Sequence, residues 1–302
     1  MDNTEVATGS AIVTRRIPFE FPDDIEPHWI PGQPELSQMV NGASLTMPYL
    51  EPFLIRTIRE ALPLLTDARL RADALAFIAQ EGQHFRAHRR FNDVLKRQSY
   101  PELALIEAQM EASYSRLGKL SLARRLAYTA GFESMTIGIT EWIVGQRRSL
   151  FAGADTRVAS FVLWHMVEET EHKTVAFDVY QATQTRYFIR IIGVMHASID
   201  VMRFSMRGYK QMLRTDGLWF SLHSRLRLAW QLGRFLRHAL PSMLRALLPS
   251  YDPRHIADHA WTLEWLRRSS ALGEYVSPPL IDTNDPEMPV PFPAVPAARA
   301  PS

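Results

Sequence analysis

Two Glu-x-x-His units, Glu81-x-x-His84 and Glu169-x-x-His172, are the feature that most constrains what this chain can fold into. Each unit lies in a stretch whose apolar residues recur at helical spacing. Residues three apart on an α-helix lie about 60° from each other around its axis, so each unit points a carboxylate and an imidazole in one direction. Two such units, joined by one lone glutamate from each of two further helices, form the ligand set of a dinuclear metal centre in a four-helix bundle.

Glu51 and Glu133 are the lone glutamates that satisfy the geometry of antiparallel helices. In such a pair, residues at the same depth lie equally far from the connecting turn. Thr66 lies fifteen residues after Glu51 and fifteen before the first Glu-x-x-His unit, and Glu133 and Glu169 are symmetric about residue 151, beside a turn predicted at 152–156. Both hairpins therefore place their carboxylates about 22 Å from the turn.

Glu60 fails the same test, because it is roughly 13 Å out of depth. The alternative interpretation is that all these glutamates are surface carboxylates on solvated helix faces. Their neighbours argue against it, since Glu81 follows Phe77 and Ile78, and Glu133 follows Phe132. Carboxylates in apolar surroundings are costly unless a cation compensates them.

His165 lies one turn before Glu169, about 40° away around the axis, so it projects toward the same place as the second unit. We favour His165 as a third imidazole ligand. The alternative is that His165 only orients a ligand carboxylate. His88, one turn after His84, is expected outside the ligand set.

The chain of 302 residues contains no cysteine, so any metal must be held by nitrogen and oxygen ligands. The first thirty residues contain no apolar core of signal-peptide length, and no uncharged apolar run approaches the roughly 18–20 residues of a membrane span. We therefore expect a cytoplasmic protein.

The predicted fold class is all-α: a ferritin-like four-helix bundle with a dinuclear metal site and additional C-terminal helices. The long helices are expected at 48–65, 68–97, 121–150 and 156–185, with shorter ones at 101–117 and 255–271. The expected segments are an extended N-terminal arm (1–34), the metal-binding bundle (35–185), a basic helical extension packed on or beside the bundle (186–272) and a disordered proline-rich tail (273–302).

Charge is distributed unevenly along the chain. Residues 186–254 carry twelve Lys and Arg against three acidic residues, whereas the rest carries 22 basic and 29 acidic residues. Basic helices with aromatic side chains are typical of membrane-surface elements. The favoured interpretation is a helix layer whose arginines pair with the acidic bundle or face water. An anionic membrane surface, and hence peripheral membrane association, is the second interpretation, and nucleic acid is the least favoured partner.

Several motifs resemble a bacterial family described as predicted metal-dependent hydrolases, within the ferritin-like superfamily. They are the segment from Ser44 to Phe53, Gln80-Glu81-x-x-His84, and the segment from Trp164 to Tyr180. The order His165-x-x-x-Glu169-x-x-His172 is also similar to that of p-aminobenzoate N-oxygenase, a di-iron enzyme in which the matching histidine is a third imidazole ligand. The resemblance implies that the ligands are Glu51, Glu81, His84, Glu133, His165, Glu169 and His172.

This ligand set suits two iron ions, with manganese or a mixed Fe/Mn pair as alternatives. The first hypothesis is an O2-activating di-iron oxygenase or oxidase that acts on a small, acyl or otherwise hydrophobic substrate and draws on an external electron donor. Its substrate pocket is expected beside Phe77, Phe132, Phe161 and Trp164. The alternative is a dinuclear metal-dependent hydrolase. A homodimer is compatible with both hypotheses.

Overall fold

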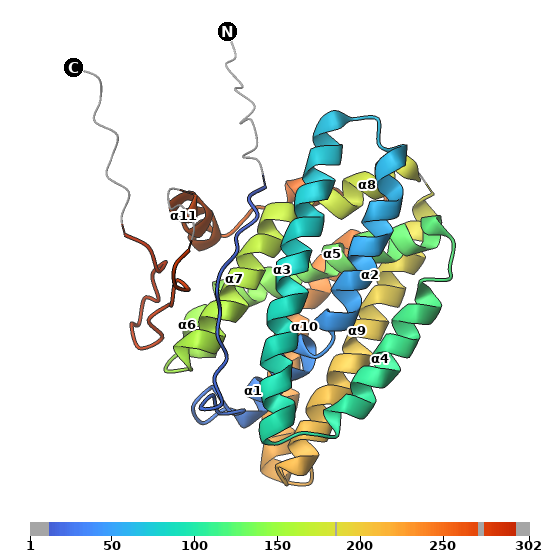
Figure 1. Cartoon of the computed structure of the whole chain (residues 1–302). Coiled ribbons are helices and arrows are strands. Elements are labelled where there is room, and N and C mark those ends of the chain that lie inside the picture. The colour runs from blue at the N-terminus through green and yellow to red at the C-terminus, as the bar shows by residue number, and fades with distance from the viewer. Residues whose placement is uncertain (1–11, 185, 271–274, 294–302) are drawn as a thin grey trace, which may run out of the picture.

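Every regular element in this computed structural model is a helix, within the residues that it describes (12–184, 186–270 and 275–293) (Figure 1). This confirms the all-α prediction. The α-helices are α1 (Pro34–Ser44), α2 (Met47–Ala61), α3 (Ala68–Gln98), α4 (Leu103–Leu117), α5 (Leu122–Gly145), α6 (Arg147–Phe151), α7 (Thr156–His172), α8 (Val175–Thr183), α9 (Tyr187–Thr215), α10 (Leu222–Ala246) and α11 (Ala260–Ser269). Two short 3₁₀ helices are η1 (Leu62–Leu64) and η2 (Pro253–His255). No helix in the described ranges has the length and apolar character needed to cross a membrane.

Four helices form the bundle that the sequence predicted: α2, α3, α5 and α7. Around its circumference α2 contacts α3 and α5, and α7 contacts α3 and α5. The helix α9 packs along α5 and α1, and α10 packs against α5 (Figure 1). The α9 layer is part of the apolar core, because Val201, Phe204 and Met212 are buried.

The two bundle turns are fixed by side-chain caps. The Asp67 carboxylate accepts hydrogen bonds from the backbone N–H groups of Arg69 (2.7 Å) and Leu70 (3.0 Å), which starts α3 at the predicted residue. Asp155 likewise accepts from Arg157 N–H (2.9 Å) and starts α7. These caps fix where α3 and α7 begin, and therefore the depth at which the carboxylates of each helix hairpin lie in the bundle.

Two predicted long helices are interrupted. The helix expected at 121–150 ends at Gly145, and α6 follows it. The helix expected at 156–185 is split into α7 and α8 directly after His172. The second interruption is small, because Lys173 and Thr174 keep near-helical backbone angles.

Residues 12–33 contain no helix and run along α3 and α7 (Figure 1). Aromatic contacts hold this arm: the Phe19 ring lies 5.4 Å from that of Trp164, and the Phe21 ring lies 5.1 Å from that of Phe161. Residues 1–11 of the predicted arm lie outside the described residues. The division of the chain into an arm, a bundle and an extension stays a prediction.

The proline-rich tail was predicted to be disordered over 273–302, and residues 275–293 instead pack on the bundle. Thr283 O–H donates to the carbonyl of Ala154 (2.6 Å), and the side chains of Ile281 and Met288 are buried. Apolar side chains spaced between the prolines anchor the segment, and proline lacks an N–H that would otherwise need a partner. Residues 273–274 and 294–302 lie outside the described residues.

The α5 and α9 backbones touch through glycine. A Cβ added to Gly193 would lie 2.1 Å from the Ala127 carbonyl oxygen, and one added to Gly131 would lie 2.5 Å from the Val194 nitrogen. Side chains at either position would push the α9 layer away from the bundle.

We predict that Gly193→Ala lowers the free energy of unfolding by about 1–3 kcal/mol or more, because the added methyl group meets rigid backbone. Chemical denaturation measures this change. The matched control is Gly233→Ala in α10, where nothing lies within 4 Å. It should raise stability by up to about 1 kcal/mol through helix propensity. Equal effects of the two substitutions would contradict the predicted close contact.

Candidate metal centre

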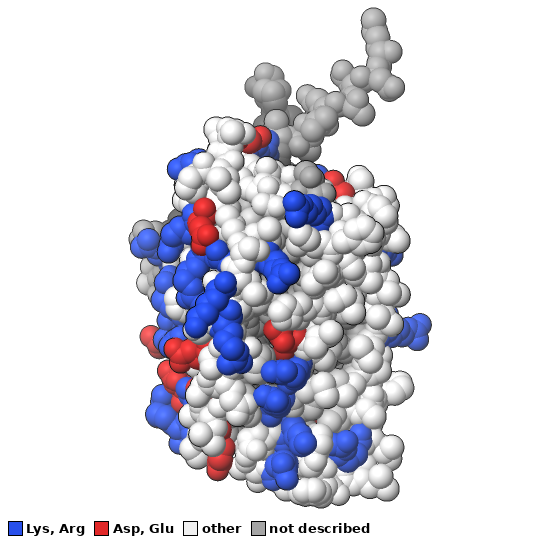
Figure 2. Space-filling view, turned by 90° about the vertical axis from the view of Figure 1, so that its right-hand side faces the viewer, with Lys and Arg blue, Asp and Glu red and all other residues white. Residues whose placement is uncertain are grey.

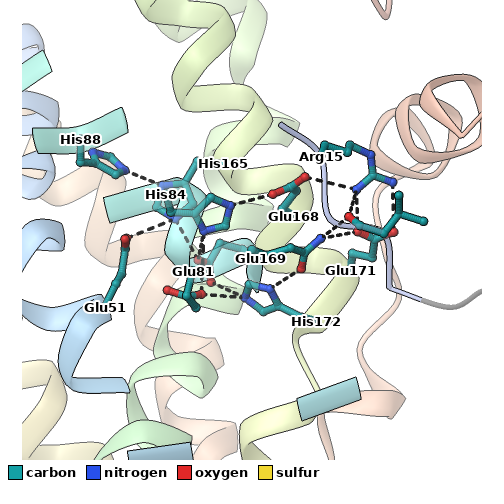
Figure 3. A network of polar contacts seen from close by, with 12 residues as sticks. Arg15, Glu51, Glu81, His84, His88, His165, Glu168, Glu169, Glu171 and His172 are labelled. Atoms are coloured by element: carbon teal, nitrogen blue, oxygen red, sulfur yellow. Dashed lines mark hydrogen bonds and ion pairs between the residues drawn. The ribbon is translucent and has the colours of Figure 1, made fainter. Parts of the chain in front are cut away.

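The seven predicted ligand residues converge in the interior of the bundle. Glu51 comes from α2, Glu81 and His84 from α3, Glu133 from α5, and the remaining three from α7. Figure 3 labels all of these residues except Glu133. All seven side chains are buried, with Glu51 completely inaccessible and Glu133 only 1% exposed. Glu60, which the depth argument excluded, is on the outside and pairs with Arg125 (2.7 Å).

Within the described residues, the cluster contains four overlapping groups of side chains that could hold a metal ion. The largest consists of Glu81, Glu133, Glu169 and His172, the second of Glu51, Glu81 and His84, the third of His84, His165 and Glu169, and the fourth of Glu51, His88 and His165. Within each group, the ligand atoms lie within 4.8 Å of one another. Glu81 and Glu169, the carboxylates of the two Glu-x-x-His units, connect the largest group to the second and third groups. The donor set is therefore large enough for two metal ions.

Many of the buried polar atoms of this cluster lack hydrogen-bond partners. Both carboxylate oxygens of Glu51, Glu81 and Glu133 are buried without one, as are His84 Nδ1 and His172 Nε2. Such atoms are rare inside proteins and cost free energy unless something compensates them. The donor set contains oxygen and nitrogen alone, which suits iron or manganese, and four carboxylates balance the charge of two divalent ions. The residues fit a dinuclear metal ion pair.

Without metal, protons must compensate the crowded carboxylates. Burial, together with the neighbouring carboxylates Glu81 and Glu169, raises the pKa of Glu51 well above its ordinary value. Burial and the Glu169 charge raise the pKa of Glu133 to about 8. Burial opposes a charge on His84, but contacts with Glu168 and Glu81 outweigh it and raise its pKa to about 9. Metal ions would replace these protons.

A hydrogen-bond relay fixes the tautomer of His172. Gln80 uses its amide N–H₂ group to donate to the Val13 carbonyl (2.9 Å) and to Glu171 (2.6 Å). Its oxygen therefore accepts from His172 Nδ1–H (2.9 Å), as the hydrogen-bond network assigns it. The lone pair of His172 Nε2 then faces the carboxylates of Glu81 (3.3 Å) and Glu133 (3.5 Å).

His84 also turns its N–H group outward, but it uses the other ring nitrogen for this, Nε2 in place of Nδ1. Its Nε2–H donates to Glu168 (2.9 Å), which also accepts from Arg15 (3.3 Å). The Nδ1 lone pair of His84 consequently points toward Glu81 (3.8 Å) and Glu169 (3.9 Å).

His165 ends a chain of four polar groups. Asn92 donates its amide N–H to the Ser44 carbonyl (3.0 Å), so its oxygen accepts from the Ser44 hydroxyl (2.8 Å). That hydroxyl accepts from His88 Nδ1–H (2.8 Å), which leaves His88 Nε2 to accept from His165 Nδ1–H (2.8 Å). The Nε2 lone pair of His165 therefore faces Glu169 (2.9 Å).

This arrangement gives His165 a ligand's orientation, because a lone pair facing a carboxylate requires a proton or a metal ion between them. His88 could hold an ion together with Glu51 and His165, but both of its ring nitrogens are engaged in this network, with Ser44 and His165. Its place outside the ligand set stays a prediction. Burial and the neighbouring His165 lower the pKa of His88 well below its ordinary value. Sequence reasoning missed the residues that orient the imidazoles through hydrogen bonds. Arg15, Gln80, Ser44 and Asn92 have no spacing signal, because their relation to the cluster depends on packing between helices.

An apolar cavity of about 100 Å³ lies beside the cluster. His165 and Glu169 form part of its wall, and Phe132, Phe161 and Met135 line it. Two of the aromatics expected there lie elsewhere: the Phe77 ring packs on His172 (4.8 Å) and the Trp164 ring on His84 (4.9 Å).

Comparison with known proteins agrees with a metal-dependent protein. The model of a family described as predicted metal-dependent hydrolase matches residues 13–257, and the chain belongs to that family. This description favours the hydrolase alternative over the oxygenase hypothesis. No curated protein and no solved structure matches the chain.

Arg15 compensates two of the carboxylates that hold the imidazoles, since it also donates to Glu171 (2.7 Å) (Figure 3). We predict that Arg15→Gln weakens metal binding by about 10–100-fold, because Glu168 and Gln80 lose their orientation. Calorimetric titration with Mn²⁺ measures the affinity. The control is Arg16→Gln, at an exposed neighbour. Unchanged affinity in Arg15→Gln would refute the role of this network.

The raised pKa of Glu133 predicts a pH dependence of the metal-free protein. A carboxyl group with a folded-state pKa of about 8, against an ordinary 4.5, contributes stability below pH 4.5 that is lost as the pH rises through 8. Glu133→Gln does not titrate, so its melting temperature should fall less between pH 5 and pH 8. Thermal melts of chelator-treated protein test this, with exposed Glu111→Gln as the control. Parallel curves for wild type and Glu133→Gln would contradict the prediction.

Proposed function

We propose that this protein is an enzyme whose catalytic centre is a pair of metal ions held by Glu51, Glu81, His84, Glu133, His165, Glu169 and His172. The observation that carries the proposal is the orientation of the three imidazoles. Each has its N–H group turned outward to a buried partner and its lone pair turned toward the carboxylates. A structural ion pair or salt-bridge network does not require all three to be oriented alike.

We further propose that the metal is iron and that the reaction is oxidation of an apolar organic substrate by O2. Four carboxylates and three imidazoles suit iron, with manganese as the alternative. A bound iron pair supplies the electrons for O2 reduction, which the side chains of the chain do not provide. Sustained turnover would then require an external electron donor.

The chain's own residues would bind and shield the substrate. The cavity beside His165 and Glu169 is lined mainly by apolar side chains, so it favours an acyl or other hydrophobic group over a charged one. The arm (12–33) covers α3 and α7, and together with the buried aromatics it keeps bulk water away from the ligands. Thr136 and Ser44 are among the few polar side chains that line this cavity.

Metal-assisted hydrolysis is the second candidate, and the family description supports it directly. In such a reaction two metal ions activate a water molecule and stabilise the charge on the leaving oxygen. The same apolar cavity would then hold the acyl part of an ester or amide.

One experiment separates the two reactions. The chain is loaded anaerobically with two equivalents of Fe²⁺, and O2 consumption is followed with an oxygen electrode in the presence of a reductant. In parallel, Zn²⁺-loaded and Mn²⁺-loaded protein is assayed with p-nitrophenyl esters of increasing acyl length. We expect O2 consumption that depends on iron, and ester turnover no higher than that of the unloaded protein.

Glu81→Gln is the control, because it removes a carboxylate that belongs to two of the four groups of possible ligands while keeping the side-chain volume. It should abolish O2 consumption and reduce the bound metal to less than two ions per chain, measured by elemental analysis. Hydrolysis would be established instead by two results together. The Zn²⁺-loaded wild type would hydrolyse the esters and Glu81→Gln would not, and the iron-loaded wild type would consume no O2. A chain that binds no metal would contradict both candidates.

A further inference from the structure

The helix α10 exposes a row of large apolar side chains. Leu226 is 62% exposed, Trp230 68% and Leu244 55%. Leu222 and Leu240 belong to the same row, and Leu248, just after the end of the helix, extends it. Single exposed apolar residues are common on soluble proteins, but a row that spans the helix, interrupted only around Gly233 and Arg237, indicates a contact surface.

This row points away from the body of the protein. The buried side of α10 is formed by residues at helical spacing, most of them small: Ser224, Leu228, Gln231, Ala239, Ser242 and Ala246. At 100° per residue, the exposed row lies roughly 180° around the helix from this buried side. The row is therefore not an incompletely covered edge of the core.

Arginines accompany the apolar row, and α10 contains no acidic residue. The five are Arg225, Arg227, Arg234, Arg237 and Arg245. Arg227, Arg234 and Arg245 recur at spacings of seven and eleven, which places them along one flank of the row. Among the described residues, none of the five forms an ion pair with a carboxylate: Arg225 stacks on Trp219, for example, and Arg227 donates to the Gly32 carbonyl. Exposure to water is one of the two arrangements expected for the arginines of this segment; the other, pairing with the acidic bundle, is seen at Arg254, after α10, which pairs with Asp178.

The neighbouring helix α9 has an exposed apolar row of its own, in which Phe188 is 77% exposed and Ile192 65%. The two helices meet where α9 begins and α10 ends, because Tyr187 O–H donates to the Leu247 carbonyl (2.6 Å). Figure 2 views the molecule from the side on which α4 and α9 lie in Figure 1. It shows Lys and Arg side chains in a band beside a wide area with few charges.

We propose that the outer face of α10 docks on an anionic membrane surface, with the leucine row and Trp230 in the lipid interface and the arginines against lipid phosphates. Two alternatives fit the observations less well. A symmetric contact with a second copy of the chain would place the same unpaired arginines against each other. A nucleic acid would satisfy the arginines but would set the leucine row against phosphates. A lipid surface satisfies both parts of the face. This proposal does not rest on the reaction assigned to the metal centre.

The experiment is co-sedimentation of the full chain with vesicles of neutral phosphatidylcholine and with vesicles that contain anionic phosphatidylserine. We expect binding to the anionic vesicles and a loss of binding as the salt concentration approaches 1 M, where charges are screened within about 3 Å. Arg237→Gln/Arg245→Gln should weaken binding roughly 30-fold, and Leu226→Gln/Trp230→Gln should weaken it further. All four residues are exposed, so circular dichroism and melting temperature should stay unchanged.

Matched controls lie on α4 and in the turn that follows it. Arg116→Gln/Lys119→Gln removes two exposed charges, and Leu105→Gln removes a leucine that is 69% exposed. Both should bind vesicles like the wild type. Equal binding to neutral and anionic vesicles, or no binding to either, would overturn the proposal. Two other outcomes would also overturn it. In the first, the wild type forms a dimer that does not bind vesicles and that Leu226→Gln/Trp230→Gln converts to a monomer. In the second, the chain binds DNA more tightly than vesicles, and Leu226→Gln/Trp230→Gln does not change the binding to DNA.

Discussion

The burial of four glutamates opposite three imidazole lone pairs is the constraint on which the rest of this structure depends. Carboxylates so close together in an apolar interior are tolerable only with positive charge between them, supplied by protons or by metal ions. The surrounding polar residues direct the imidazole lone pairs toward the place where this positive charge is needed. Gln80, Glu168 and His88 each take one imidazole N–H and turn the free nitrogen inward. The helix caps at Asp67 and Asp155 set the depth at which the carboxylates meet.

The outer hydrogen-bond partners make the cluster asymmetric. His84 and His172 are both connected to Arg15 through carboxylates, whereas His165 is connected to the neutral chain of His88, Ser44 and Asn92. The neutral chain lies on the side of the apolar cavity, since Ser44, His88 and His165 line it. A substrate in this cavity would therefore contact the side of the cluster formed by His165 and Glu169, under either of the two proposed reactions.

The sequence was sufficient to predict the helical fold and the convergence of seven site residues, because both depend on periodicity and on distance along the chain. Glu51 and Glu133 could be selected, and Glu60 rejected, by counting residues from the two turns. The network around the imidazoles could not be predicted, since Arg15 reaches Glu168 and Glu171 from an arm without regular structure. The packing of residues 275–293 was missed for a related reason: composition indicated disorder, whereas a few buried side chains such as Ile281 and Met288 decide the outcome.

Arg15 also connects the two ends of the chain. Besides the two carboxylates, its guanidinium donates to the Ser269 hydroxyl (3.1 Å) and lies over the Trp265 ring (5.5 Å), both in α11. During synthesis, Arg15 leaves the ribosome early, whereas Trp265 and Ser269 leave it only when most of the chain has been translated. A nascent chain that lacks α11 therefore cannot form every contact of Arg15, the residue that also pairs with Glu168 and Glu171.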